Sequence, residues 1–107
     1  MAKQRVAAAS AIVPGQVCVV ECGSRSLALS NVDGVLYAID NRCTHDDGPL
    51  GEGRLRNGRV ICPRHGAMFD AQTGRVLSLP AVRDVASYAV TVEGDDVFVE
   101  NPDGDAR

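Results

Sequence analysis

The sequence predicts an all-β protein. Short runs rich in β-branched residues alternate with turn signals, and no amphipathic segment of helical length interrupts them. The chain has 107 residues, of which 45% are hydrophobic and 23% are charged. This is enough for one modest hydrophobic core, so we expect a single domain over residues 1–107.

Short strand-like segments near both ends of the chain carry this prediction. Residues 17–21 and 26–29 are separated by Gly23-Ser24, and a turn over residues 31–34 leads into residues 35–39. Near the end of the chain, residues 87–93 and 97–100 flank a turn at residues 94–96. Neighbouring segments joined by tight turns predict antiparallel pairing.

The middle of the chain, about residues 41–80, differs in composition. It holds six of the eleven glycines, three of the five prolines and both histidines. We expect a small, loop-rich subdomain here, mounted on the β scaffold, because functional loops are commonly supported by rigid strands.

Within this subdomain, two short motifs each combine a cysteine with a histidine. Cys43-Thr44-His45 is followed, after sixteen residues, by Cys62-Pro63-Arg64-His65-Gly66. Two cysteines on one iron and two histidines on the other are the ligands of a Rieske [2Fe–2S] centre. A single turn can point both side chains of each motif toward one centre. The motifs therefore predict one [2Fe–2S] cluster on Cys43, His45, Cys62 and His65.

A structural zinc site is the alternative, since two cysteines and two histidines also satisfy tetrahedral zinc. The usual zinc patterns pair ligands of the same kind, with two cysteines in one arm and two histidines in the other. Here each arm is mixed, which favours the iron–sulfur interpretation.

The motifs resemble the two Rieske boxes, with Leu50 after the first and Thr73-Gly74 and Pro80 after the second. The resemblance covers about residues 4–100 and is strongest to the stand-alone ferredoxins of multicomponent ring-hydroxylating (aromatic) dioxygenases. It implies the Rieske fold, an antiparallel β-sandwich scaffold with a cluster-binding subdomain. It also implies that His45 and His65 lie at a solvent-exposed tip.

Four positions indicate the Rieske subtype by comparison with respiratory Rieske proteins. Those proteins carry a disulfide at the positions of Gly48 and Arg64, and serine and tyrosine hydroxyls at the positions of Ala67 and Phe69. Hydrogen bonds to the sulfurs tune the potential, and donors there stabilise the more negative, reduced state. The resemblance therefore implies a low-potential cluster, near about −150 mV.

The residues also indicate a carrier rather than an enzyme. A terminal oxygenase needs a second iron on two histidines and a carboxylate, yet both histidines are already assigned to the cluster. No G-x-G-x-x-G fingerprint for a nucleotide is present. We expect a soluble one-electron carrier between an NAD(P)H-dependent flavoprotein reductase and a terminal Rieske non-haem iron oxygenase. A ferredoxin or small redox subunit of another oxidoreductase pathway is the alternative.

The chain's charge and its first residues bear on partners and location. A net charge of −3 argues against nucleic-acid binding. Residues 6–13 form an apolar run of eight residues, ended by Pro14-Gly15, that is too short to span a membrane. We therefore expect a cytoplasmic monomer that does not bind membranes, in preference to a protein with a signal peptide.

Three charged residues and two further cysteines have more than one interpretation. Arg64, Asp46 and Asp47 either contribute to a docking surface or are solvated loop residues without a role. Cys18 and Cys22 share one face of a predicted strand. Because buried free cysteines behave as small hydrophobic residues, we expect both to be structural.

Overall fold

The computed structural model describes residues 3–44, 47–79, 81 and 83–100. The elements in chain order are β1 (Lys3–Ala8), η1 (Ala9–Ala11), β2 (Val17–Cys22), β3 (Arg25–Val32), β4 (Val35–Asp40), η2 (Leu50–Glu52), β5 (Arg54–Arg56), β6 (Arg59–Ile61), β7 (Met68–Asp70), β8 (Ser87–Tyr88), β9 (Val90–Glu93) and β10 (Asp96–Glu100). The η elements are single 3-10 turns. No helix in the described part of the chain has the length and apolarity needed to cross a bilayer.

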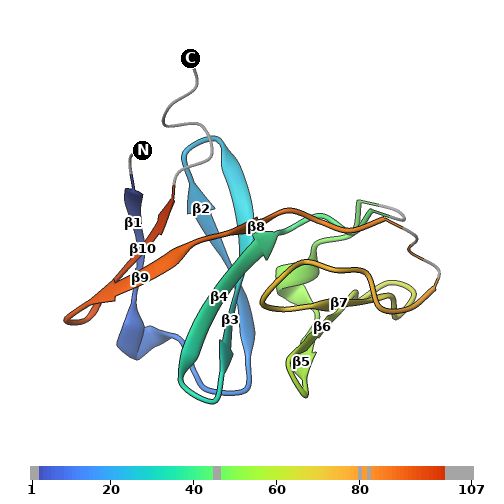
Figure 1. Ribbon diagram of the computed structural model, residues 1–107, viewed down its shortest axis with the longest axis horizontal. Coiled ribbons are helices and arrows are strands. Elements are labelled where there is room, and N and C mark those ends of the chain that lie inside the picture. Colours follow the sequence, from blue (N-terminus) through green and yellow to red (C-terminus); the bar gives the residue numbers. More distant parts are fainter. Residues whose placement is uncertain (1–2, 45–46, 80, 82, 101–107) are drawn as a thin grey trace.

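The strands form three antiparallel sheets, seen side by side in Figure 1. The central sheet has the order β2-β3-β4-β8. On one side lies the sheet β1-β10-β9, and on the other lies the sheet β5-β6-β7. The predicted all-β, antiparallel fold is confirmed.

The central strand β3 is buried on both faces, which explains this layered arrangement. Leu27 and Leu29 point toward β10, whereas Ala28, between them, points toward β6 and β7. Successive side chains of a strand face opposite sides of the sheet. Each face of the central sheet therefore has its own hydrophobic core.

The scaffold core fills the space between the central sheet and the sheet β1-β10-β9. Its buried residues are Ile12, Val20, Cys22, Leu27, Leu29, Ala38, Val97 and Val99. Cys22 is fully buried, and the half-buried Cys18 packs against the same core. Burial raises the pKa of the Cys18 thiol and so disfavours its reactive thiolate form. Both cysteines thus pack in the scaffold core, as expected of small hydrophobic residues.

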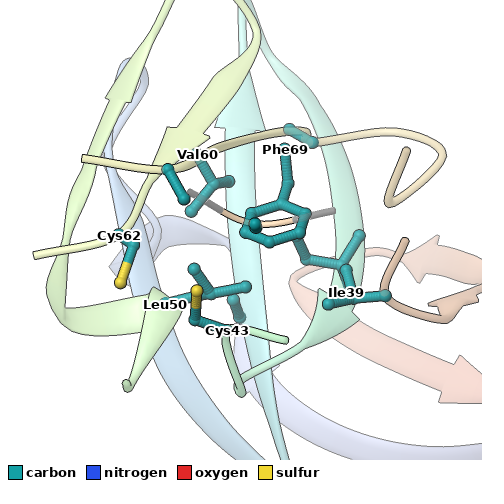
Figure 2. Packing of buried hydrophobic residues seen from close by; sticks show 11 residues of the cluster. Ile39, Cys43, Leu50, Val60, Cys62 and Phe69 are labelled. Atoms are coloured by element: carbon teal, nitrogen blue, oxygen red, sulfur yellow. The ribbon is translucent and has the colours of Figure 1, made fainter. Parts of the chain in front are cut away.

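The second core, which we call the cluster core, lies between the central sheet and the sheet β5-β6-β7. Its largest members are Ile39, Leu50, Val60 and Phe69. Cys43 and Cys62 belong to the same core, and Figure 2 shows the phenyl ring of Phe69 packed among these aliphatic side chains.

Three differences from the sequence prediction concern strands. Residues 3–8, for which no strand was predicted, form β1 and pair with β10. The region 41–80 is not only loops, because β5, β6 and β7 form a sheet within it. The predicted strand over residues 87–93 is divided into β8 and β9, which join different sheets.

The β5–β6 hairpin had a clear sequence signal that the prediction did not use. Asn57-Gly58 lies between the alternating segments Arg54–Arg56 and Arg59–Ile61. Both turn residues have positive φ, 52° for Asn57 and 75° for Gly58. This is the conformation for which Asn-Gly is favoured in two-residue hairpins.

The β4–β8 junction is held by a side-chain hydrogen bond. The hydroxyl of Tyr88 donates to Asp40 Oδ1 at 2.6 Å. Burial and this hydrogen bond, together with the charge of Asp40, raise the pKa of Tyr88 to about 12, although nearby Arg25 opposes the shift. The folded protein therefore holds the hydroxyl proton more tightly than the unfolded chain does.

This shift predicts a loss of stability at alkaline pH. The contribution of Tyr88 is fully present below pH 10, the ordinary pKa, and is lost as the pH rises toward about 12. Tyr88→Phe should lower the free energy of unfolding by about 1 kcal/mol at neutral pH and reduce its decline between pH 10 and 12. Denaturant titrations between pH 10 and 12 measure the free energy of unfolding of each variant. Tyr37→Phe is the control, and its free energy of unfolding should fall over this range as in the wild type. An equal decline in Tyr88→Phe would contradict the assignment.

Candidate metal centre

The first cluster loop, residues 43–48, begins three residues after Asp40, the last residue of β4. The N–H of Cys43 donates to the carbonyl of Gly48, and the N–H of Asp47 donates to the carbonyl of Cys43, both at 2.8 Å. Asp47 has a φ of 62°. Aspartate tolerates this left-handed conformation better than most residues. An exposed ion pair, 3.6 Å between Arg42 Nε and Asp47 Oδ1, lies at the same loop.

The second cluster loop, residues 62–67, repeats this backbone pattern. The N–H of Cys62 donates to the carbonyl of Ala67 at 2.8 Å, and the N–H of Gly66 donates to the carbonyl of Cys62 at 3.2 Å. Gly66 has a φ of 78°. In both loops the cysteine therefore forms backbone hydrogen bonds with the residues four and five positions later. The residue four positions later has positive φ. The two loops therefore share this hydrogen-bond pattern at the residues that the structure describes.

The structure brings two of the four predicted ligands, Cys43 and Cys62, into one core. Cys43 is fully buried, Cys62 is 2% exposed, and both lie in the cluster core. Figure 2 shows the two cysteines on neighbouring segments at one border of this core. His65 is exposed at the end of the second loop. His45 lies outside the described residues, as do Asp46 and Pro80.

A third segment closes against the first loop, and sequence reasoning did not find this contact. The hydroxyl of Thr44 donates to the carbonyl of Arg83 at 2.6 Å. The N–H of Val85 donates to the carbonyl of Gly74 at 2.9 Å, and a Cβ on Gly74 would lie 2.2 Å from the Val85 carbonyl oxygen. No motif links these positions, because their approach follows from the return of the chain to β8.

Two glycines of the subdomain serve packing against protein. Gly48, Gly51, Gly53 and Gly66 lie near the two ligand motifs, where glycine is expected to let the backbone approach a cluster. A Cβ on Gly53 would lie 1.9 Å from the carbonyl oxygen of Ile61 in β6, and one on Gly51 would lie 2.6 Å from the side chain of Val19 in β2. For these two positions the structure supplies a different reason, namely close packing of η2 against two sheets.

The structure describes all four positions that indicate the Rieske subtype, namely Gly48, Arg64, Ala67 and Phe69. Gly48 is buried and Arg64 is exposed, so neither offers a sulfur for a bridge between the loops. None of the four cysteines of the chain forms a disulfide. Ala67 and Phe69 are fully buried in the cluster core. The surroundings of Cys62 at these two positions therefore contain a methyl group and a phenyl ring, without hydroxyl donors.

Comparison with protein families decides between the two metals. The sequence model of the Rieske [2Fe-2S] domain matches residues 2–89. The chain belongs to the Rieske [2Fe–2S] family. Membership in this family means one [2Fe–2S] cluster, and the structural zinc alternative is therefore set aside.

Two of the known proteins with similar sequence or structure are ferredoxins of dioxygenases. The 3-phenylpropionate/cinnamic acid dioxygenase ferredoxin subunit of Escherichia coli (strain K12) is 42% identical over 78 residues, which are 72% of this chain and 74% of the relative. The ferredoxin of carbazole 1,9a-dioxygenase from Nocardioides aromaticivorans IC177 superposes with a TM-score of 0.88 at 29% identity, covering 92% of this chain and 97% of that one.

A third similar structure is the complex of reduced oxygenase and oxidized ferredoxin in carbazole 1,9a-dioxygenase. It matches with a TM-score of 0.86 at 33% identity, covering 92% of this chain and 93% of that one. This chain thus resembles dioxygenase ferredoxins over most of its length. It is a Rieske ferredoxin, an electron-transfer component and not itself the catalyst.

The donor set fits a Rieske cluster. Thiols and imidazoles are the ligands such a cluster takes, and the two loops place one buried thiol each in a shared apolar core. The one described imidazole lies at the surface. The arrangement therefore has a protected thiol end and an exposed imidazole end.

The positive φ of Gly66 predicts a selective effect of substitution. A Cβ at Gly66 meets no atom within 4 Å, so only the backbone conformation constrains this residue. Gly66→Val should cost about 1–2 kcal/mol through left-handed strain and accelerate cluster loss on warming, whereas Gly66→Asn should behave nearly as the wild type. Visible absorbance against temperature measures this.

Gly94→Val is the matched control, because Gly94 also has positive φ and open surroundings but lies in the β9–β10 turn. It should lower the unfolding temperature without cluster loss before unfolding. Identical cluster retention in the Gly66→Val and Gly66→Asn variants would contradict the role assigned to the second loop.

Proposed function

We propose that this Rieske ferredoxin carries single electrons from an NAD(P)H-dependent flavoprotein reductase to a terminal Rieske non-haem iron oxygenase that acts on an aromatic ring. The observation that carries this proposal is the placement of the thiols and the described imidazole. Cys43 and Cys62 are buried, whereas His65, three residues after Cys62, is exposed. When bound, the cluster supplies a one-electron couple.

The proposed ligands are Cys43 and Cys62 for one iron and His45 and His65 for the other. Each cysteine has the same two backbone hydrogen bonds. Its N–H donates to the carbonyl five residues later, and its carbonyl accepts from the N–H four residues later. This arrangement favours symmetric binding from both sides. The described imidazole, at the surface, would shorten the path by which an electron enters or leaves.

The proposed docking site is the tip that carries the histidines. Its described part includes exposed His65 and Arg64. Leu79, which is 75% exposed, lies in the segment that runs beside Met68 and so adds an apolar side chain to this end. A small exposed apolar patch with a polar surround suits transient contact between proteins. The carbazole 1,9a-dioxygenase ferredoxin, a similar structure, forms a complex with its oxygenase.

We further propose a single-domain, cytoplasmic monomer that delivers its electrons without binding a membrane or nucleic acid. The net charge of −3 supports the last point. Service to a different oxidoreductase pathway is the second candidate. Reconstitution with candidate reductases and oxygenases, scored by NAD(P)H-dependent hydroxylated product, tests the proposal. Reduction of the protein by a reductase, without electron delivery to any oxygenase tested, would favour the second candidate.

Substitution of the proposed ligands tests the site directly. Cys62→Ser and His45→Cys should each abolish the normal visible spectrum and the rhombic EPR signal of the reduced protein, because each changes the charge and donor strength at one iron. Cys18→Ala is the matched control, since Cys18 belongs to the scaffold core. A wild-type spectrum in Cys62→Ser, or its loss in Cys18→Ala, would refute the assignment.

The potential should respond to hydroxyl groups added in the cluster core. We propose a low potential, near about −150 mV, because the positions of Ala67 and Phe69 offer no donor to sulfur. Ala67→Ser and Phe69→Tyr should each raise the midpoint potential, and the double substitution should raise it further. Protein-film voltammetry measures the shift. A midpoint that does not move in either variant would show that another term sets the potential.

A further inference from the structure

The charges of the chain are divided unevenly between the scaffold and the cluster-binding end. Residues 41–86 contain seven arginines and five acidic residues, whereas the rest of the chain contains four basic and nine acidic residues. The end that carries the cluster loops is therefore cationic within a protein of net negative charge.

Three of these arginines form one exposed surface, which we call the arginine face. In the β5–β6 hairpin, Leu55 pairs with Val60 on the inner side, where Val60 is fully buried. Alternation then places Arg54, Arg56 and Arg59 on the outer side, and all three are exposed. Figure 1 shows that this hairpin lies beyond the central sheet, away from the sheet β1-β10-β9.

The arginine face is not explained by folding stability. Arg56 and Arg59 are direct cross-strand partners, and like charges in this position are destabilising. Asp70 of β7 pairs with Arg59 in register, but its Oδ1 accepts hydrogen bonds from the N–H groups of Gln72 and Thr73. Among the residues that the structure describes, none forms a salt bridge with these three arginines.

The arginine face continues into the second cluster loop. A surface hollow extends from Arg54 and Ile61 to Cys62, Pro63 and Gly66. Exposed Arg64 lies in the same loop, one residue before His65. A partner held on the arginine face would therefore lie next to the proposed exit point of the electron.

We propose that the arginine face binds a carboxylate-rich surface of a redox partner protein and thereby orients the cluster loops toward that partner. The inference rests on the proposed carrier function and adds the chemistry of the docking surface. Complementary charge raises association rates and fixes the orientation of an encounter. A protein is favoured over nucleic acid, because the acidic scaffold would repel an extended polyanion.

The test uses two haem proteins of opposite charge as electron acceptors, acidic cytochrome b5 and basic cytochrome c. The dithionite-reduced holoprotein gives one electron to the ferric haem of either acceptor, and stopped-flow absorbance follows the reaction. The informative variant is Arg56→Gln/Arg59→Gln. The matched control is Lys3→Gln/Arg5→Gln, which removes the same net charge from β1, where both side chains are exposed.

At low ionic strength the Arg56→Gln/Arg59→Gln variant should reduce cytochrome b5 about tenfold more slowly than the wild type. The difference should disappear in high salt, since screening removes attraction between exposed charges. The control should stay within about twofold, and reduction of cytochrome c should not slow in either variant. The unfolding temperature should stay the same or rise, because a like-charge pair has been removed.

Four results would overturn the inference. Two concern rates, namely an unchanged rate of cytochrome b5 reduction in the Arg56→Gln/Arg59→Gln variant, or equal slowing in the control variant. The third is a lower unfolding temperature of the Arg56→Gln/Arg59→Gln variant, which would mark the arginines as structural. The fourth is binding of a short DNA duplex at physiological salt that depends on Arg56 and Arg59. The failure of the carrier function would look different. In that case the wild-type protein itself would lack a reducible cluster or would give no electron to either haem protein.

Discussion

The backbone hydrogen bond from each cluster-loop cysteine to a carbonyl five residues later is the constraint on which the site depends. It joins Cys43 to Gly48 and Cys62 to Ala67, and in each loop a left-handed residue stands at the fourth position after the cysteine. Because the same closure occurs twice, two thiols from distant parts of the chain reach one apolar core. The placement of the two thiols is thus a property of the backbone.

The central sheet makes this arrangement stable in a small protein. Since β3 and β4 are buried on both faces, the cluster core is supported by a sheet that the scaffold core already holds in place. Contacts such as Thr44 with the carbonyl of Arg83 then bring the returning chain against the first loop. The result is a pair of buried thiols and an exposed imidazole on the cluster loops, with a cationic hairpin beside them.

The sequence was sufficient to predict the type of cluster and the local hairpins. It was insufficient to predict how distant segments pack together. Cysteine and histidine mixed within each arm predicted the cluster, and turn residues such as Asp33-Gly34 predicted hairpins, because both signals are local. The pairing of β1 with β10, the division of residues 87–93 and the approach of Gly74 to Val85 depend on tertiary contacts, so no local pattern encodes them. The β5–β6 hairpin is an intermediate case, since Asn57-Gly58 was a usable signal. Its arginines became informative only when the register placed them on one face.

The central claim is that one cluster is held by two cysteines and two histidines supplied by these paired loops. Pulsed EPR of the reduced protein, with nitrogen-15 in histidine only, tests it most directly. The account predicts two distinct histidine nitrogens coupled to the electron spin, of which one coupling is lost in a variant of His65. A cluster without histidine nitrogen coupling, or with couplings unaffected by substitution of His65, would contradict the account.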